Sequence, residues 1–155
     1  MLEIGQEAPY FSLGNQDDVD MNLKMFKGKW VVLYFYPKDN TPGCSTEACE
    51  FTDSLPEFED IDAVILGVSP DSTKSHRNFI AKKEIGFTLL SDTEKDVIKA
   101  YGAWGPKKLY GKEYEGVFRS TFIISPDQKI AALWSKVRVK GHVEAVKEKL
   151  KELQN

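Results

Sequence analysis

Both cysteines of this chain lie in Pro37-Lys-Asp-Asn-Thr-Pro-Gly-Cys-Ser-Thr-Glu-Ala-Cys49, directly behind the apolar run Trp30-Val-Val-Leu-Tyr-Phe-Tyr36. The apolar run is short, continuous and rich in β-branched and aromatic residues, which is typical of a strand buried on both faces. A proline follows it at once and limits its extension. The sequence therefore predicts a buried strand that leads straight into the cysteine segment.

The residues before the first cysteine predict the start of a helix. Thr41 is a good N-cap, Pro42 suits the first helical position, and Gly43 leaves the backbone uncovered. Cys44 would then lie in the first helical turn, where unpaired amides and a partial positive charge favour an anion. We therefore expect Cys44 to react as a thiolate and to be the nucleophile of the protein.

The second cysteine, Cys49, follows five residues after Cys44. Helix geometry places their two Cα atoms roughly 8.6 Å apart. A disulfide requires less than about 7 Å between Cα atoms. If both residues lie in one intact helix, a bond between them requires the helix to unwind locally.

Other interpretations of the cysteine pair remain open from the residues alone. Free cysteines are often small buried apolar residues, and a structural disulfide would be expected only in a secreted protein. Zinc needs about four ligands, and only His76 and His142 could join the pair, neither in a ligand-spaced motif. Gly105 and Gly111-Lys112 resemble a phosphate loop, but the spacing is one residue too long and Glu113 replaces the hydroxyl residue. We expect neither a metal nor a nucleotide cofactor.

Composition limits the class of protein. A chain of 155 residues with 41% hydrophobic and 12% aromatic content suits one domain with a sizeable core, covering residues 1–155. A net charge of −3 gives no electrostatic reason to expect nucleic acid or an anionic membrane as partner. No apolar run is long enough to span a bilayer, and the acidic N-terminus lacks the features of a secretory signal. We expect a cytoplasmic protein without a membrane or nucleic-acid partner.

Further elements follow from hydrophobic patterns and turn residues. We expect an opening hairpin (10–13 and 19–23), strands at 63–68 and 87–90, helices at 73–83 and 143–153, and a late hairpin (119–125 and 129–134). Ser91 and Glu94 have the spacing of a capping box, which predicts a short helix to about residue 101. Residues 102–116 are glycine-rich, basic and aromatic, and we expect a functional connection there. Strands that alternate with helices predict a mixed sheet flanked by helices.

The spacing of Pro37, Thr41 and Cys44 resembles the active-site signature of the peroxiredoxins, thiol peroxidases built on the thioredoxin fold. The extension to Glu47 and Cys49 is similar to the PrxQ, or bacterioferritin comigratory protein, subgroup, although Ser45 stands where threonine is expected. The segment 116–124 resembles the one that delivers the active-site arginine, here Arg119. The resemblance implies a thioredoxin-like three-layer α/β fold with an N-terminal β-hairpin extension.

The resemblance also implies an activity. Cys44 would reduce hydrogen peroxide or an organic hydroperoxide and become a sulfenic acid, which Cys49 would resolve as an intramolecular disulfide. Thioredoxin or a similar dithiol would reduce that disulfide, and because the resolving cysteine is in the same chain we expect a monomer. Arg119 and Thr41 would bond the sulfur or the peroxide. No metal, haem or flavin is implied.

The remaining motif residues have alternative interpretations. Glu47 would support the polar network and Pro37 belongs to the signature, but a glutamate on a helix is often merely solvated. Arg119 could equally be a strand-end arginine that reaches to water. A protein disulfide oxidoreductase of the same fold is the alternative activity, although such proteins generally pair their cysteines as C-x-x-C. A non-enzymatic interaction domain with incidental cysteines is a further alternative.

Overall fold

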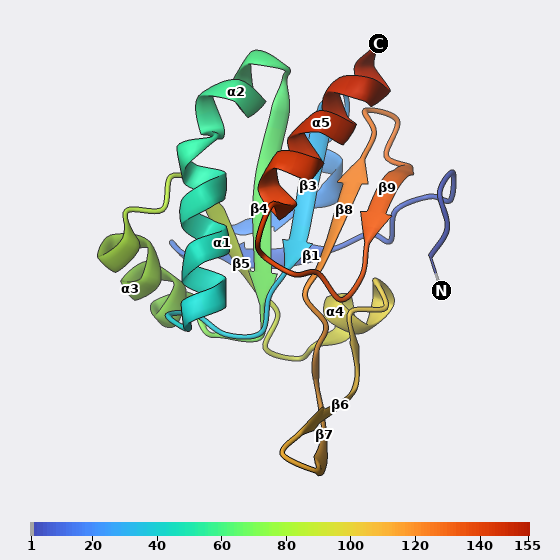
Figure 1. Ribbon diagram of the computed structural model, residues 1–155. Helices are drawn as coiled ribbons and strands as arrows, with labels where there is room; N and C mark the ends of the chain where they lie inside the picture. The colour runs from blue at the N-terminus through green and yellow to red at the C-terminus, as the bar shows by residue number, and fades with distance from the viewer. Residues whose placement is uncertain (1) are drawn as a thin grey trace.

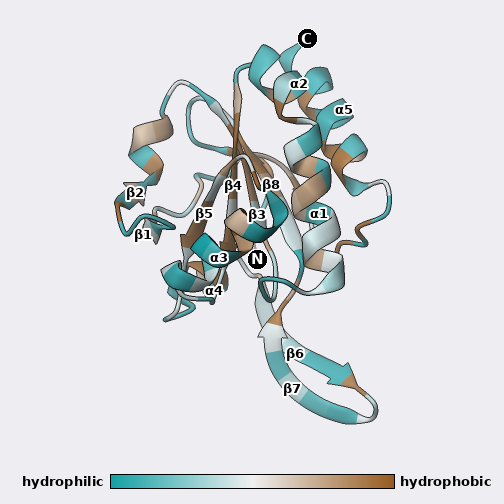
Figure 2. Cartoon of the chain, turned by 90° about the vertical axis from the view of Figure 1, so that its left-hand side faces the viewer, coloured by the Kyte–Doolittle hydropathy of each residue, from teal (hydrophilic) through white to brown (hydrophobic). Residues whose placement is uncertain are grey.

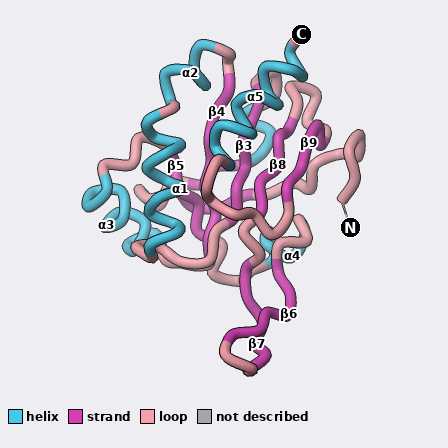
Figure 3. Tube along the Cα trace, in the orientation of Figure 1, coloured by secondary structure: helices cyan, strands magenta, loops and turns pink. Residues whose placement is uncertain are grey.

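The computed structural model describes residues 2–155. Its main sheet is mixed and has seven strands in the order β2-β1-β5-β4-β3-β8-β9 (Figures 1 and 3). The strands of this sheet are β1 (Ser12–Asn15), β2 (Asp20–Asn22), β3 (Trp30–Phe35), β4 (Ala63–Ser69), β5 (Thr88–Ser91), β8 (Ser120–Ile124) and β9 (Ile130–Trp134). β3, β4 and β5 run parallel, whereas β8 and β9 continue the sheet in antiparallel fashion.

β3 is a central strand with both faces covered, as the sequence predicts. It pairs in parallel with β4 and antiparallel with β8, so its backbone groups are bonded on both edges. Val32 and Tyr34 belong to the apolar cluster on one face of the sheet, and Val31, Leu33 and Phe35 belong to the cluster on the other. This alternation follows from the period of two in a pleated strand.

Helices cover both faces of the sheet and complete three layers. The helices are η1 (Leu23–Phe26), α1 (Pro42–Asp53), α2 (Leu55–Asp60), α3 (Thr73–Lys83), α4 (Asp96–Ala100) and α5 (His142–Gln154). The helices α1, α2, α3 and α5 pack on one face of the sheet through Phe51, Phe58, Phe79 and Val146, respectively. η1 and α4 pack on the other face. Figure 2 shows the apolar strands enclosed between helices with hydrophilic outer surfaces.

The thioredoxin-like architecture and its N-terminal hairpin extension are confirmed. β1 and β2 form the expected hairpin, and β1 extends the sheet by pairing antiparallel with β5. α3 has the predicted bounds, and the late hairpin is present as β8 and β9. Between residues 2 and 155 the structure contains no helix with the length and apolar character that a bilayer span requires.

The predicted capping box at Ser91 and Glu94 is wrong. Ser91 is the last residue of β5, and its hydroxyl donates to the carbonyl of Asp71. The short helix begins only at Asp96, after Lys95 in the left-handed region (φ 65°). Asp92 supplies the side-chain bond instead, since its Oδ2 accepts from the amide of Ile98 at 2.8 Å. An aspartate one residue later thus supplies the acceptor that the capping box assigned to serine.

The stretch 102–116 is mainly a β-hairpin rather than an irregular connection. β6 (Trp104–Leu109) pairs with β7 (Lys112–Val117), and this two-stranded unit projects away from the main sheet (Figure 1). Tyr110 (φ 51°) and Gly111 (φ 78°) form its two-residue turn. Positive φ at both positions is the geometry that suits tight hairpins, usually with asparagine or aspartate first. This hairpin has Tyr110 in that position, and its strands lack apolar alternation. The sequence therefore does not indicate the hairpin.

Close packing in the centre of the sheet gives a test of the fold. A Cβ at Gly67 in β4 would lie 2.8 Å from Leu89 Cδ2 and 3.0 Å from the Tyr34 ring. We expect Gly67→Ala to lower the free energy of unfolding by about 1–3 kcal/mol, because the buried neighbours must shift. Urea denaturation measures this change.

Gly14→Ala is the matched control in β1. A Cβ there meets its nearest atom, Thr73 Cγ2, at an ordinary 3.7 Å, so stability should be unchanged or slightly raised. Equal stability of the two variants would show that the core adapts freely around Gly67.

Candidate active site

The loop from β3 into α1 places the first cysteine at the start of the helix. Thr41 has the extended backbone of an N-cap, and its carbonyl accepts from the amide of Ser45 at 2.8 Å. The Thr41 hydroxyl donates to the carbonyl of Lys38 at 2.8 Å and does not bond a helix amide. The N-cap position is therefore confirmed, while the first-turn amides beside Cys44 lack a side-chain cap and can face an anion.

Cys44, Glu47 and Arg119 meet in one hydrogen-bonded group. Arg119 Nη2 donates to Cys44 Sγ at 3.2 Å, and Arg119 Nη1 donates to Glu47 Oε1 at 2.6 Å. Glu47 is fully buried, and the Arg119 side chain is 16% exposed. One guanidinium therefore links a sulfur and a carboxylate that are 75 and 72 residues away in sequence.

Sheet pairing and a glycine bring Arg119 to the helix. Arg119 immediately precedes β8, whose first residue Ser120 pairs with Phe35 at the end of β3. A Cβ at Gly43 would lie 3.2 Å from Arg119 Nη2, tighter than most Cβ contacts. Glycine at this position therefore lets the guanidinium approach the first turn of α1.

Burial and ion pairing have opposite effects on the charges of this group. Burial raises the pKa of the Glu47 carboxyl from 4.5 to about 7, and the guanidinium of Arg119 opposes part of that rise. Burial alone would lower the pKa of Arg119. The charges and hydrogen bonds of Glu47 and Cys44 have the larger effect, and the pKa of Arg119 is raised above its ordinary value. Arg119 therefore stays charged, whereas Glu47 changes its charge near neutral pH.

Tyr34 lies in the same buried cluster as Cys44, although no sequence motif points to it. Burial, then the charges of Glu47 and Cys44, raise the pKa of Tyr34 well above its ordinary value. Among residues 2–155, neither the Tyr34 hydroxyl nor Glu47 Oε2 has a hydrogen-bond partner. An apolar strand gives no sequence signal that one of its tyrosines lies beside a charged site.

An open cleft of about 400 Å³ lies beside Arg119. Its lining combines apolar and cationic side chains: Pro37, Pro106, Phe118, Val137, Lys107, Lys108, Lys136 and Arg119. Cys44 is only 2% exposed, so Arg119 is the residue that both lines the cleft and contacts the sulfur. The lysines of the β6–β7 hairpin reach the site only because that hairpin folds beside the loop of Pro37.

The residues expected at the site do not all meet. Cys44, Glu47 and Arg119 are in direct contact, and Thr41 and Pro37 lie on the loop before α1. Cys49 is half-buried on the same intact helix, and both cysteines are free thiols.

The two histidines bond elsewhere. His76 contacts Asp39 and the Leu90 carbonyl, and His142 bonds the Thr121 hydroxyl at 2.7 Å. Burial, then the charge of Arg119, lower the pKa of His142 to about 4, so its ring is neutral at pH 7.

Comparisons with known proteins match the chain over most of its length. The family model described as the AhpC/TSA family matches residues 4–133. Peroxiredoxin Bcp from Bacillus subtilis is 47% identical over 152 residues, which are 98% of this chain and 97% of that protein. A putative peroxiredoxin bcp from Helicobacter pylori strain J99 is 48% identical over 149 residues, 96% of this chain and 98% of that protein.

Solved structures agree with these relatives. A PrxQ mutant from Xylella fastidiosa has a TM-score of 0.95 at 42% identity and covers 100% of this chain and 99% of its own. The bacterioferritin comigratory protein of Xanthomonas campestris, studied for alkyl peroxide reduction in trapped intermediate and ligand complexes, has a TM-score of 0.93 at 41% identity. That match covers 99% of this chain and 100% of the Xanthomonas chain.

The raised pKa of Glu47 predicts a pH dependence of stability. Between about pH 4.5 and 7 Glu47 keeps its proton in the folded state but has lost it in the unfolded state. The contribution of Glu47 to the free energy of unfolding is therefore fully present below pH 4.5 and decreases as the pH rises to 7. Relative to Glu47→Gln, we expect the protein with Glu47 to lose about 2.5 kcal/mol of unfolding free energy between pH 5 and pH 8.

Urea denaturation at the two pH values measures this difference. Both proteins should carry Cys44→Ser, so that the thiol does not titrate. A stability difference that is the same at pH 5 and pH 8 would show that Glu47 does not change its charge in this range.

Proposed function

Because the chain belongs to the AhpC/TSA family and its relatives are peroxiredoxins, we propose that it is a thiol-dependent peroxidase that reduces hydrogen peroxide and organic hydroperoxides. The contact between Arg119 Nη2 and Cys44 Sγ carries this proposal. A guanidinium donor at 3.2 Å and the amides of a helix N-terminus both favour a sulfur anion at this point.

In the first step the Cys44 thiolate attacks the terminal oxygen of the hydroperoxide. The S–O bond forms as the O–O bond breaks, and the departing alkoxide or hydroxide takes up a proton. Arg119 and the first-turn amides stabilise the charge that develops on the oxygens. Cys44 is left as a sulfenic acid.

The other motif residues support this step. Glu47 holds the guanidinium of Arg119 in place through the bond at 2.6 Å. The Thr41 hydroxyl donates its hydrogen bond to the carbonyl of Lys38, so its oxygen lone pairs can accept a hydrogen bond from the hydroperoxide. Pro37 lines the cleft beside Arg119, which we propose as the entry route of the oxidant.

The second step forms a disulfide within the chain. Cys49 attacks the sulfur of the sulfenic acid and water leaves. Both cysteines lie on α1, which is continuous from residue 42 to 53 and holds their Cα atoms roughly 8.6 Å apart by helix geometry. The helix therefore unwinds locally before the bond can form.

We propose that thioredoxin or a similar dithiol reduces this disulfide by exchange. Both reacting cysteines come from one helix of one chain, so a single-domain monomer contains the whole cycle. Two free thiols suit a reducing compartment, which supports the cytoplasm as the location.

Cysteine variants test the cycle. Cys44→Ser should reduce thioredoxin-linked peroxide turnover to background, because the nucleophile is lost. Cys49→Ser should allow one rapid oxidation, followed by accumulation of a sulfenic acid that dimedone traps. Stopped-flow fluorescence with hydrogen peroxide gives the oxidation rate, and mass spectrometry identifies the trapped product.

Two outcomes would contradict this cycle. Oxidation of Cys44 no faster than that of a free thiol would remove the peroxidase activity. Full turnover by Cys49→Ser would show that Cys49 is not an obligatory resolving residue.

The unwinding step predicts a change in helix content. We expect the disulfide form to lose about 4–7 residues of helical circular dichroism relative to the reduced form, which is one to two turns of α1. Oxidised Cys49→Ser is the control, because it forms the sulfenic acid without the internal disulfide and should keep its helicity. If the protein with a confirmed Cys44–Cys49 disulfide kept the helicity of the reduced form, the unwinding step would be contradicted.

A further inference from the structure

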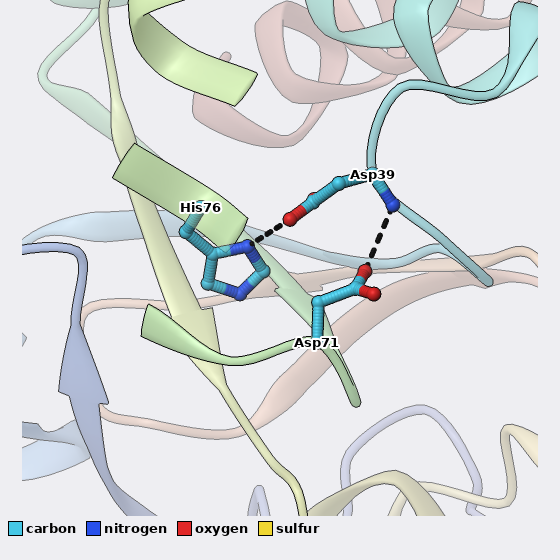
Figure 4. A group of neighbouring side chains, drawn as sticks. All are labelled: Asp39, Asp71 and His76. Atoms are coloured by element: carbon cyan, nitrogen blue, oxygen red, sulfur yellow. Dashed lines mark hydrogen bonds and ion pairs between the residues drawn. The ribbon is translucent and has the colours of Figure 1, made fainter. Parts of the chain in front are cut away.

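A buried polar cluster holds the loop that precedes Cys44. Asp39 lies in the loop after β3, Asp71 in the turn after β4, and His76 on α3 (Figure 4). His76 Nδ1 lies 2.8 Å from Asp39 Oδ2, and the Asp39 amide donates to Asp71 Oδ2 at 2.8 Å. His76 is fully buried and Asp39 is 6% exposed. The activity described above does not use any of these side chains.

Each ring nitrogen of His76 faces a polar partner. Nδ1 faces the Asp39 carboxylate, and Nε2 faces the carbonyl of Leu90 at 3.0 Å. Both the Asp39 carboxylate and the Leu90 carbonyl can accept a hydrogen bond from the ring. The Tyr36 hydroxyl donates to Asp39 Oδ1 at 2.6 Å and is not the donor for the ring. His76 therefore links the loop that carries Asp39 to β5 through two buried contacts.

The cluster also contains atoms that could bind a cation, and most of them are already hydrogen-bonded. Asp39, Asp71 and His76 bring possible ligand atoms within 4.8 Å of one another. Asp39 Oδ2 also accepts from the Ser75 hydroxyl at 2.7 Å, and Asp71 Oδ2 accepts from the Ser69 hydroxyl at 2.7 Å. Three of the four carboxylate oxygens of Asp39 and Asp71 thus already take part in hydrogen bonds, which favours a structural support over a cation site.

The position of Asp39 affects the active site through the backbone of the loop between β3 and α1. The next residue, Asn40, has a left-handed conformation (φ 61°), which persists where the surroundings fix it. Thr41 follows, and its carbonyl accepts the first bond of α1 from Ser45. A movement of Asp39 therefore displaces the N-cap of α1 and the Cys44 sulfur relative to Arg119. Arg119 does not move with them, because it lies just before β8.

We propose that His76, through Asp39, is a positioning residue for peroxide reduction by Cys44. It contacts neither the sulfur nor the substrate and acts by fixing the loop 37–41. This inference rests on the proposed peroxidase function, and it applies to the oxidation step. Resolution by Cys49 requires α1 to unwind and therefore does not depend on the same alignment.

His76→Phe and His76→Gln test the proposal by stopped-flow fluorescence. Phenylalanine fills the space without donors, and we expect the second-order rate constant for Cys44 oxidation to fall by about 10- to 100-fold, as for a displacement of the order of 1 Å. Glutamine keeps a donor, so its loss of rate should be smaller than that of phenylalanine but still more than twofold. The rate of the later disulfide step should stay within about twofold of the unmodified protein, since unwinding breaks the alignment anyway.

Arg77→Gln is the matched control on the same helix. Arg77 pairs with Asp18 at the surface and does not contact the loop, so both rates should be unchanged. Asp39→Ala also removes the bonds from Tyr36 and Ser75, so its own loss of rate should be at least as large as that of His76→Phe. The double variant should lose less than the sum of the two single losses, because both substitutions break the same contact.

The outcomes separate this inference from the function on which it rests. Slow oxidation of the unmodified protein would contradict the peroxidase function itself. Rapid oxidation of the unmodified protein with both His76 variants within twofold of it would overturn the positioning role alone. An equal loss in the oxidation and resolution steps would also overturn it, because it would indicate general loosening of the fold. If His76→Phe does not fold, His76→Gln alone decides between these results.

Discussion

A buried guanidinium shared by a sulfur and a carboxylate is the interaction on which the site depends. Arg119 is largely removed from water, and an unpaired charge there would cost several kcal/mol. Cys44 and Glu47 are three residues apart, so they lie on the same face of α1 and meet Arg119 together. Ala48 and Phe51 pack that face of α1 into the core, and they thereby set the helix rotation that the site requires.

The mixed sheet explains why these groups converge. β3 and β4 are parallel, so the loop with Pro37 and the turn with Asp71 leave the same edge of the sheet. β8 is antiparallel to β3 and therefore begins at that edge, with Arg119 just before it. Strand direction thus places Cys44, the loop before it and Arg119 at the same end of the sheet.

Two groups of buried polar side chains hold the loop and the helix that carry Cys44, and they differ in how completely they are hydrogen-bonded. The cluster of Asp39, Asp71 and His76 has a hydrogen bond for each ring nitrogen and each aspartate, which suits a rigid support. Glu47 has a bond on one oxygen only among the residues described, and its pKa is raised to about 7. The first arrangement favours one fixed geometry, whereas the second leaves a charge that responds to pH near neutrality.

Local patterns in the sequence determined the buried strand, the start of α1 with Cys44 in its first turn, and the spacing of Cys49, because these depend on neighbouring residues. The motif also identified Glu47 and Arg119 as candidates. Only the tertiary structure decided that both contact one another, that Lys107 of the projecting hairpin lines the cleft, and that His76 supports the loop. Such contacts join residues 37 to 72 positions apart, so strand pairing and packing create them and no local sequence pattern records them.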